Sequence, residues 1–311
     1  MTSTVAGNVY NTLFSVAGKN VLITGGSRGI GLMIAQGYVA AGANVVLTSR
    51  DENACRDAIS QIQQQRNHNH DPLRNNTPAF VTSTLSTREG CEELANKVDK
   101  IFHGRLDILI NNAGTSWGEP LERNSKTNWG FDKVLDLNVK GLFYLTRACI
   151  PLLRRGADKG NNSNDTSENT TSTSKDTNAT DIPVDPARII NIGSVTGMVP
   201  QEAPTHAYDI SKAAVHQLTR KFSKDLAPYN ITVNCLAPGF VPTRMSSGLA
   251  SWGGTADVLS KHIPLGRMGN ADDMVGACIY LSSRAGSWCT GVILNVDGGT
   301  IGAMQIPLSS L

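Results

Sequence analysis

The chain has 311 residues, of which 40% are apolar and 17% charged, and its 28 Lys and Arg against 26 Asp and Glu give a formal net charge of +2. This near-neutral balance argues against a protein that grips nucleic acid or an anionic membrane through charge. The apolar content argues against disorder of the whole chain. No apolar run approaches the ~18–20 residues that span a bilayer, so we expect no membrane span.

The ends of the chain and its cysteines indicate the compartment. Neither a secretory signal nor an Arg-rich transit peptide is visible near the start, which predicts a cytoplasmic protein. The ending Ser309-Ser310-Leu311 leaves a peroxisomal location as a less favoured alternative. None of the six cysteines has metal-binding or C-x-x-C spacing, so we expect reduced thiols, mostly in the core. His68 and His70 lack companion ligands, so we expect no metal site.

Short apolar runs alternate with helical patterns from about residue 20 onward. The runs cover residues 21–24, 44–48, 80–81, 106–110, 188–192, 231–236 and 292–296. Continuous apolar strands separated by helices are typical of a parallel sheet that is covered on both faces. The pattern therefore predicts an α/β fold with a doubly wound parallel sheet, of the Rossmann type.

Two polar segments interrupt this alternation. Residues 63–79 lack periodicity and predict a polar loop. In residues 160–181, 18 of the 22 residues are Asn, Ser, Thr or Asp, which predicts a disordered insert because so little apolar surface is available for burial. Without these segments the length suits one domain rather than two. We expect an N-terminal extension over 1–17, a single domain over 18–303 and a C-terminal tail over 304–311.

A glycine-rich turn follows the first predicted strand. Gly25 suits a tight turn, Gly29 a close approach of the backbone to a pyrophosphate, and Gly31 close packing of the next helix. The start of that helix offers unpaired N–H groups and a partial positive charge to phosphates. The turn predicts a dinucleotide site, with these candidate residues: Thr24, Gly25, Ser27, Arg28, Gly29, Ile30 and Gly31.

The end of the second strand indicates which dinucleotide is bound. An NAD site usually has a carboxylate there, but this chain has Ser49 and Arg50, and Arg28 lies in the preceding turn. Two guanidinium groups can hold a 2′-phosphate through charge-assisted hydrogen bonds. We therefore predict NADP(H), although Asp51 could instead pair with Arg50.

A possible acid–base pair opens a later helical stretch. Tyr208 and Lys212 are four residues apart and so share a helix face. A nearby ammonium favours the phenolate, which predicts a lowered pKa for Tyr208. Ser194 and the segment Asn112-Ala113-Gly114 each follow a predicted strand, at the edge of the sheet where α/β sites form.

Together these motifs resemble the short-chain dehydrogenase/reductase family. The resemblance covers roughly residues 16–303 outside the two polar segments. It also includes Asn138 and the segment Pro238-Gly239-x-x-x-Thr243. Within the family the chain is most similar to β-ketoacyl (3-oxoacyl-ACP) reductases of the rhamnolipid-biosynthesis type, through stretches such as GGSRGIGLMIAQ and LDILINNAGTSWG.

The resemblance implies a role for each residue of the motifs. Tyr208 would protonate the substrate carbonyl oxygen, and Ser194 would hydrogen-bond that oxygen. Lys212 would bind the nicotinamide ribose and tune Tyr208, and Asn138 would hold a water molecule in a proton relay. Thr243 and the Pro238–Gly239 loop would seat the nicotinamide. Asn112, with Ala113 and Gly114, would face the adenosine.

The resulting prediction is an NADPH-dependent carbonyl reductase that acts on a 3-oxoacyl thioester or a similar ketone. One alternative is the same chemistry on a polyol, steroid or quinone-like substrate, and a remote one is a non-enzymatic NADP-binding protein. Substrate choice should lie in residues 245–269, where Met245, Leu249, Trp252, Val258 and Leu259 are apolar and several glycines suggest a mobile lid. The resemblance also implies a homotetramer or homodimer.

Overall fold

The computed structural model describes residues 12–68, 77–122, 129–157, 185–247 and 256–302. These residues form one seven-stranded sheet with the strand order β3-β2-β1-β4-β5-β6-β7, and all neighbouring strands are parallel. The strands are β1 (Asn20–Thr24), β2 (Asn44–Ser49), β3 (Ala79–Thr82), β4 (Ile108–Asn111), β5 (Ala187–Ile192), β6 (Ile231–Pro238) and β7 (Ile293–Val296). Each coincides with a predicted apolar run, so the doubly wound Rossmann fold is confirmed.

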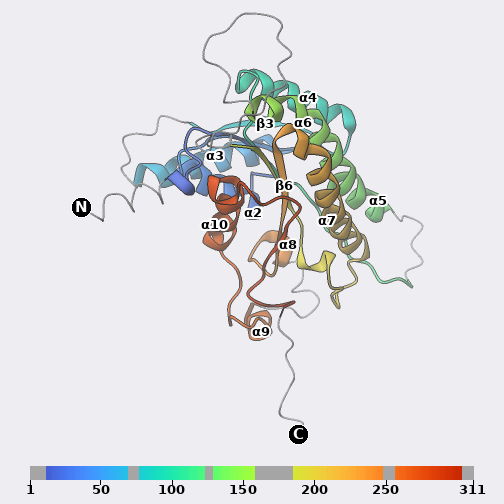
Figure 1. Cartoon of the computed structure of the whole chain (residues 1–311). Helices are drawn as coiled ribbons and strands as arrows, with labels where there is room; N and C mark the ends of the chain where they lie inside the picture. Colours follow the sequence, from blue (N-terminus) through green and yellow to red (C-terminus); the bar gives the residue numbers. More distant parts are fainter. Residues whose placement is uncertain (1–11, 69–76, 123–128, 158–184, 248–255, 303–311) are drawn as a thin grey trace, which may run out of the picture.

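Helices cover both faces of the sheet (Figure 1). The longer ones are α2 (Gly29–Ala40), α3 (Glu52–His68), α4 (Arg88–Ile101), α6 (Leu142–Ala157), α7 (His206–Leu226) and α10 (Ala271–Ser282). The shorter ones are α5 (Trp129–Leu135), α8 (Arg244–Ser247), α9 (Ala256–Lys261), the π-helix η1 (Asp136–Gly141) and the 3₁₀ turns η2 (Val195–Gly197), η3 (Ala227–Tyr229) and η5 (Arg284–Gly286). None of the described helices is long and apolar enough to cross a membrane.

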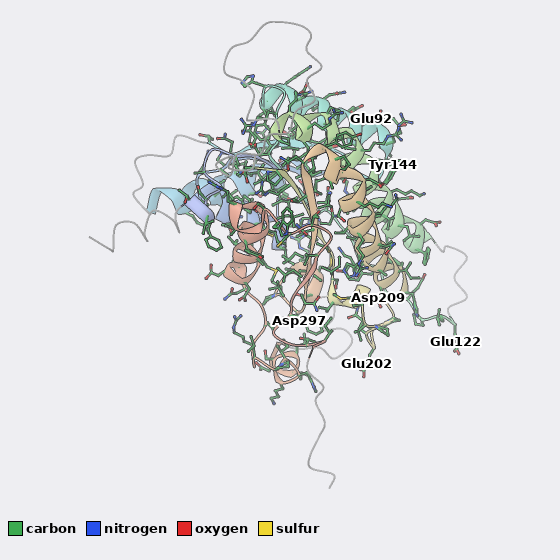
Figure 2. All side chains as sticks on the ribbon, viewed as in Figure 1. Glu92, Glu122, Tyr144, Glu202, Asp209 and Asp297 are labelled. Carbon is green, nitrogen blue, oxygen red and sulfur yellow. The ribbon has the colours of Figure 1, made fainter. Side chains whose placement is uncertain are left out.

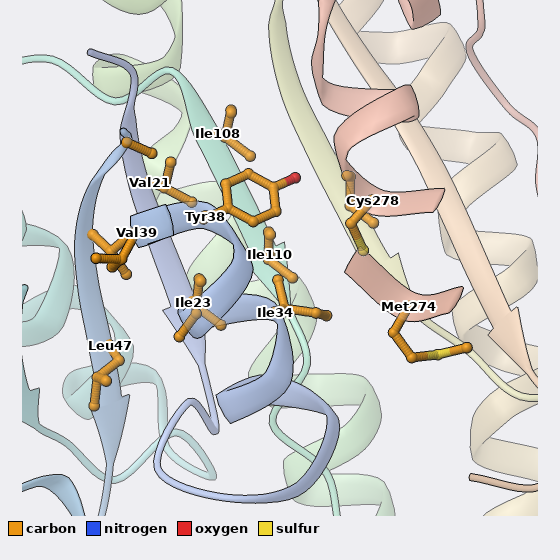
Figure 3. Packing of buried hydrophobic residues seen from close by; sticks show 14 of the residues in the cluster. Val21, Ile23, Ile34, Tyr38, Val39, Leu47, Ile108, Ile110, Met274 and Cys278 are labelled. Atoms are coloured by element: carbon orange, nitrogen blue, oxygen red, sulfur yellow. The ribbon is translucent and has the colours of Figure 1, made fainter. Parts of the chain in front are cut away.

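Two apolar cores hold these layers together. One core joins the sheet to α2, α3 and α10, and the other joins it to α4, α6 and α7. Figure 3 shows the first core, where the ring of Tyr38 from α2 lies among side chains of β1, β4 and α10. Its buried hydroxyl lies 2.5 Å from Ser282 Oγ, so its polar atom is satisfied.

The strand order reverses between β1 and β4. The chain continues from β1 to β2 and β3 on one side, whereas β4 to β7 lie on the other. In such sheets ligands bind outside the carboxyl ends of the strands, at the point where the order reverses. β1 ends at Thr24 and β4 ends at Asn111 on this edge. The predicted glycine turn and the segment Asn112-Ala113-Gly114 therefore both lie here.

The opposite, amino edge of the sheet carries a buried ion-pair cluster. Arg188 is fully buried, and its Nη2 lies 2.6 Å from Asp185 Oδ1. The other carboxylate oxygen of Asp185 lies 2.5 Å from Lys19 Nζ. The carboxylate therefore bridges the residue before β1 to the segment that leads into β5. Burial acts to raise the pKa of Asp185, but the hydrogen bonds and charges of Arg188 and Lys19 together outweigh it and lower that pKa.

The structure corrects two of the predicted boundaries. Residues 63–68 are helical and belong to α3, because the run of Gln and Arg there has good helix propensity although it lacks an apolar face. Val16 is fully buried in the first core, so the folded domain begins before residue 18. The insert 160–181 and the tail 304–311 lie outside the described residues.

Candidate active site

The glycine turn has the backbone geometry expected of a dinucleotide cradle. Gly25 and Gly29 adopt φ angles of +63° and +55°, which favour glycine. A Cβ atom on Gly31 would lie 2.3 Å from the Gly25 carbonyl oxygen, so only glycine lets α2 start this close to the turn. The predicted reasons for Gly25 and Gly31 agree with this geometry, and at Gly29 the positive φ adds a further reason for glycine.

The first turn of α2 is suited to an anion. Arg28 is the N-cap residue, no side chain caps the helix, and the first turn has no acidic residue. The leading N–H groups therefore have no side-chain acceptor, and the helix dipole adds positive potential there. The donor set and the space that the glycines leave fit a pyrophosphate.

The segment after β4 braces this turn. Thr24 Oγ1 accepts hydrogen bonds from the backbone N–H groups of Asn112 and Ala113, both at 2.9 Å. The side chain of Asn112 donates to the carbonyl oxygens of Thr24 and Gly25, at 2.9 and 3.2 Å. The amide nitrogen of Asn112 is thus directed at the turn, which it helps to position, and its expected contact with the adenosine stays a prediction.

The end of β2 presents a basic side chain at the edge of a cavity. Arg50 is exposed and, with Ser86, Thr115 and residues of α5 and η1, lines a cavity of about 380 Å³. Asp51, the possible competitor, accepts a hydrogen bond from Ala54 N at 3.1 Å and so caps α3. Among the described residues no carboxylate forms an ion pair with Arg28 or Arg50. Both guanidinium groups therefore remain candidates for a phosphate contact.

The loop after β6 closes over the glycine turn. Gly239 N donates to Val296 O at 3.0 Å, and a Cβ on Gly239 would lie 2.8 Å from Cβ of Asp297. A Cβ on Gly29 would lie 3.5 Å from Cγ2 of Thr243, so the side chain of Thr243 faces the glycine turn. The predicted Pro238–Thr243 segment and the phosphate turn therefore lie together. Asp297, just after β7, lies toward the same end of the molecule as Asp209 of α7 (Figure 2).

Ser194, Tyr208 and Lys212 lie together beyond the end of β5. Ser194 is the N-cap residue of η2 and is buried, and a hydrogen bond links its side chain to that of Tyr208. Lys212, one turn along α7, is 5% exposed, and its ammonium donates to Ile192 O at 2.7 Å. Its Nζ lies 5.4 Å from the centre of the Tyr208 ring.

The pKa of Tyr208 differs from the prediction. Burial raises the pKa of Tyr208 to about 12, and only the hydrogen bond from Ser194 opposes this. The expected lowering by Lys212 fails because burial destabilises the phenolate more than its surroundings stabilise it. Burial also lowers the pKa of Lys212 to about 8. At neutral pH Tyr208 therefore holds its proton and is an acid, beside a lysine that is still mostly charged.

Asn138 lies within the π-helix η1, a kind of helix that often occurs at functional sites. Its Oδ1 accepts from Thr115 N at 2.9 Å, and its Nδ2 donates to Thr115 O at 3.0 Å and to Ser211 Oγ at 2.9 Å. Asn138 thus links the loop that follows β4 to helix α7. These bonds show that the side chain of Asn138 positions both segments, whereas its expected role in holding a water molecule stays a prediction.

A polar cluster beside Ser194 was missed in the sequence. Thr196 Oγ1 lies 3.1 Å from Ser194 Oγ, and Asp209 accepts hydrogen bonds from Thr196, Thr205 and Gln201. Burial raises the pKa of Asp209. Asp209 directly follows Tyr208, a signal that could have drawn attention to it.

The predicted substrate segment is only partly described. Met245 in α8 and Val258 in α9 are exposed, at 46% and 44%, and so offer apolar surface. Leu249, Trp252 and the glycines of the expected lid lie outside the described residues. All six cysteines are free and five are buried, as predicted. The described residues contain no cluster of three metal-ligating side chains; His70 and the His68 side chain lie outside them.

Comparisons with known proteins indicate the family of the chain. The short chain dehydrogenase profile matches residues 19–176, and the profile described as enoyl-(acyl carrier protein) reductase matches residues 169–300. The rhamnolipids biosynthesis 3-oxoacyl-[acyl-carrier-protein] reductase of Pseudomonas aeruginosa is 38% identical, over 92% of this chain and 97% of its own length. A gluconate 5-dehydrogenase of Gluconobacter oxydans is 33% identical, over 92% of this chain and 96% of its own length.

A solved structure matches the fold as well. The Pseudomonas aeruginosa RhlG/NADP active-site complex aligns with a TM-score of 0.77 and 38% identity, and covers 93% of this chain and 98% of that one. Fold, cradle and acid–base group define an oxidoreductase that acts on CH–OH or C=O groups. The chain belongs to the short-chain dehydrogenase/reductase family, as its motifs predicted.

Proposed function

We propose that the protein is an NADPH-dependent carbonyl reductase that converts a 3-oxoacyl thioester, or a similar ketone, to the 3-hydroxy product. The observation that carries the proposal is the position of Tyr208, which is hydrogen-bonded to Ser194 and whose ring centre lies 5.4 Å from Lys212 Nζ, beside a dinucleotide cradle. One relative reported above is named a 3-oxoacyl-[acyl-carrier-protein] reductase and the solved structure contains NADP by name, which supports both the substrate class and the cofactor.

The cofactor would be held by the edge of the sheet that carries the glycine turn. NADPH, when bound, supplies the hydride. The residues proposed to hold it are Thr24, Gly25, Ser27, Arg28, Gly29, Ile30, Gly31, Ser49, Arg50, Ala113, Gly114, Lys212, Pro238, Gly239 and Thr243, with Tyr208 at the reacting end and Asn112 behind the turn. Arg28 and Arg50 would bind the 2′-phosphate and so select NADPH over NADH.

The chain's own residues manage the proton. Tyr208 Oη donates its proton to the carbonyl oxygen as negative charge develops on it, because an alkoxide is a far stronger base than a phenolate. Ser194 Oγ orients the same oxygen by a hydrogen bond. The Lys212 ammonium stabilises the phenolate that remains, and Asn138 holds the surrounding backbone through Thr115 and Ser211.

The substrate class rests on the segment that follows Thr243. The exposed side chains of Met245 and Val258 would make apolar contacts with an acyl chain. A hydroxylated substrate such as a sugar acid is the second candidate. The polar group of Thr196, Gln201 and Asp209 beside Ser194 supports it, as does the similarity to a gluconate 5-dehydrogenase.

NADPH oxidation should be measured with acetoacetyl-CoA, longer 3-oxoacyl thioesters, diketones, ketoses and sugar acids. We expect the highest kcat/KM with 3-oxoacyl thioesters, increasing with chain length. Activity on sugar acids alone would favour the second candidate. Binding of NADPH without turnover of any carbonyl would indicate a non-enzymatic role.

We further propose a cytoplasmic homotetramer or homodimer that assembles through the outer face of α6 and α7. Phe143 of α6 is 37% exposed and stacks on Phe222 of α7 with 5.8 Å between ring centres. Ile210, elsewhere on α7, is 52% exposed. Sedimentation of the purified chain tests this assembly, and Phe143→Glu should shift it toward the monomer.

A further inference from the structure

Helix α7 carries a third titratable side chain in line with Tyr208 and Lys212. His216 lies one turn beyond Lys212, which places it on the same face of the helix. It is 3% exposed, and none of the steps proposed above uses it.

The imidazole of His216 lies against both ends of the turn that carries Ser194. A Cβ on Gly193 would lie 2.5 Å from His216 Nε2, and a Cβ on Gly197 would lie 2.8 Å from its Cε1. The two glycines thus flank Ser194 in sequence and leave the space that the ring fills. The ring thus packs against both ends of the turn, and Gly197 also lies close to the α7 backbone at Lys212 and Ala213.

The hydrogen bonding of the ring fixes its orientation. A bond to the backbone of Gly197 favours the protonated form of His216, so a ring N–H donates to the Gly197 carbonyl. His216 Nε2 is buried and has no hydrogen-bond partner among the described residues, which leaves Nδ1 as the donor.

The charge of the ring is also fixed. Burial and the charges of Lys212 and Arg220 lower the pKa of His216 to about 4. Cys235 of β6 lies beside the same space, because a Cβ on Gly193 would also lie 2.6 Å from its Sγ. Burial raises the pKa of this thiol to about 11, so it is not an anion that offsets those charges. The imidazole is therefore neutral throughout the working pH range and does not repel the Lys212 ammonium.

We infer that His216 is a positioning residue, whose neutral imidazole holds the Gly193–Gly197 turn against α7 and so aligns Ser194 with Tyr208. This inference rests on the proposed reductase function. An apolar residue of similar size would fill the space but would leave the Gly197 carbonyl without its donor. Asparagine would offer an amide N–H close to the position of Nδ1.

A double-mutant cycle with Ser194 tests the inference. His216→Leu should lower kcat by roughly tenfold to a hundredfold with an unchanged KM for NADPH, because a small misplacement affects the transition state and not the cofactor cradle. His216→Asn should restore most of kcat. In a Ser194→Ala background His216→Leu should change kcat by less than about twofold, because its effect passes through Ser194.

Two controls separate this role from general destabilisation. Val215→Ala, at a buried neighbour on the same helix, should lower the melting temperature without changing kcat. If His216→Leu does not fold, His216→Met takes its place in the cycle. Additive losses in the double variant, or an Asn variant as slow as the Leu variant, would overturn the inference. Full activity of Ser194→Ala alone would instead refute the proposed function.

Discussion

Replacing Asn138 with alanine should lower the free energy of unfolding by more than the contribution of a single hydrogen bond. The substitution removes the acceptor for Thr115 N and the donor to Thr115 O in one step. A buried polar group that loses its partner costs about 1–3 kcal/mol. Thr115 is only partly buried, so we take the lower part of that range and expect about 2–4 kcal/mol in total. Ser211 adds little, because its hydroxyl still donates to Tyr208 O at 2.7 Å.

For a domain of this size 1 kcal/mol corresponds to roughly 2–4 °C, so the melting temperature should fall by about 4–16 °C. Urea unfolding followed by circular dichroism measures the change in free energy, and the m-value should remain that of the parent. Asn295→Ala, at an exposed position on β7, is the matched control and should stay within about 0.5 kcal/mol of the parent. An Asn138→Ala variant that unfolds within 1 kcal/mol of the parent would refute this reasoning.

Tyr208→Phe should abolish NADPH oxidation and leave NADPH binding, measured by fluorescence, within about twofold; a variant with full turnover would disprove the acid role. Arg50→Ala should raise KM for NADPH by roughly tenfold to a hundredfold, the effect of one lost charge-assisted contact, and leave KM for NADH nearly constant; equal effects on both would contradict the 2′-phosphate site. The rate of reduction should fall as pH rises through about 8, because Lys212 loses its proton there. If Lys212→Met shows the same decline with pH, the decline belongs to another group. Gly31→Ala should weaken NADPH binding in a titration, since its Cβ would lie 2.3 Å from Gly25 O, and unchanged affinity would mean that the turn can yield.

Most of the fold was predictable, because each strand is a continuous apolar run between polar or glycine-rich segments. The site edge followed from topology, since parallel strands carry their terminal residues to one edge. The boundary of α3 was not predictable from periodicity, because residues 63–68 form a helix without an apolar stripe. The burial of Val16 was missed for a similar reason: a single residue has no pattern.

Motifs gave the identity of the site residues but not their environment. The pKa of Tyr208 depends on burial, which no spacing in the sequence reports. The direction of the Asn112 amide depends on the shape of the glycine turn. His216 was within reach, because a histidine four residues after Lys212 must share its helix face.

The ion pairs of Asp185 fix one of two points of the chain that lie on the side of the molecule opposite the candidate active site, and this has a practical consequence. One point is the end of α6 at Ala157, where Gly156 packs on the carbonyl of Leu106, and the other is Asp185, which forms ion pairs with Lys19 and Arg188. Both points lie at the amino edge of the sheet, whereas cofactor and substrate would meet at the carboxyl edge. A peptide tag inserted between these two points can therefore attach the enzyme to a solid support with its active site facing the solution.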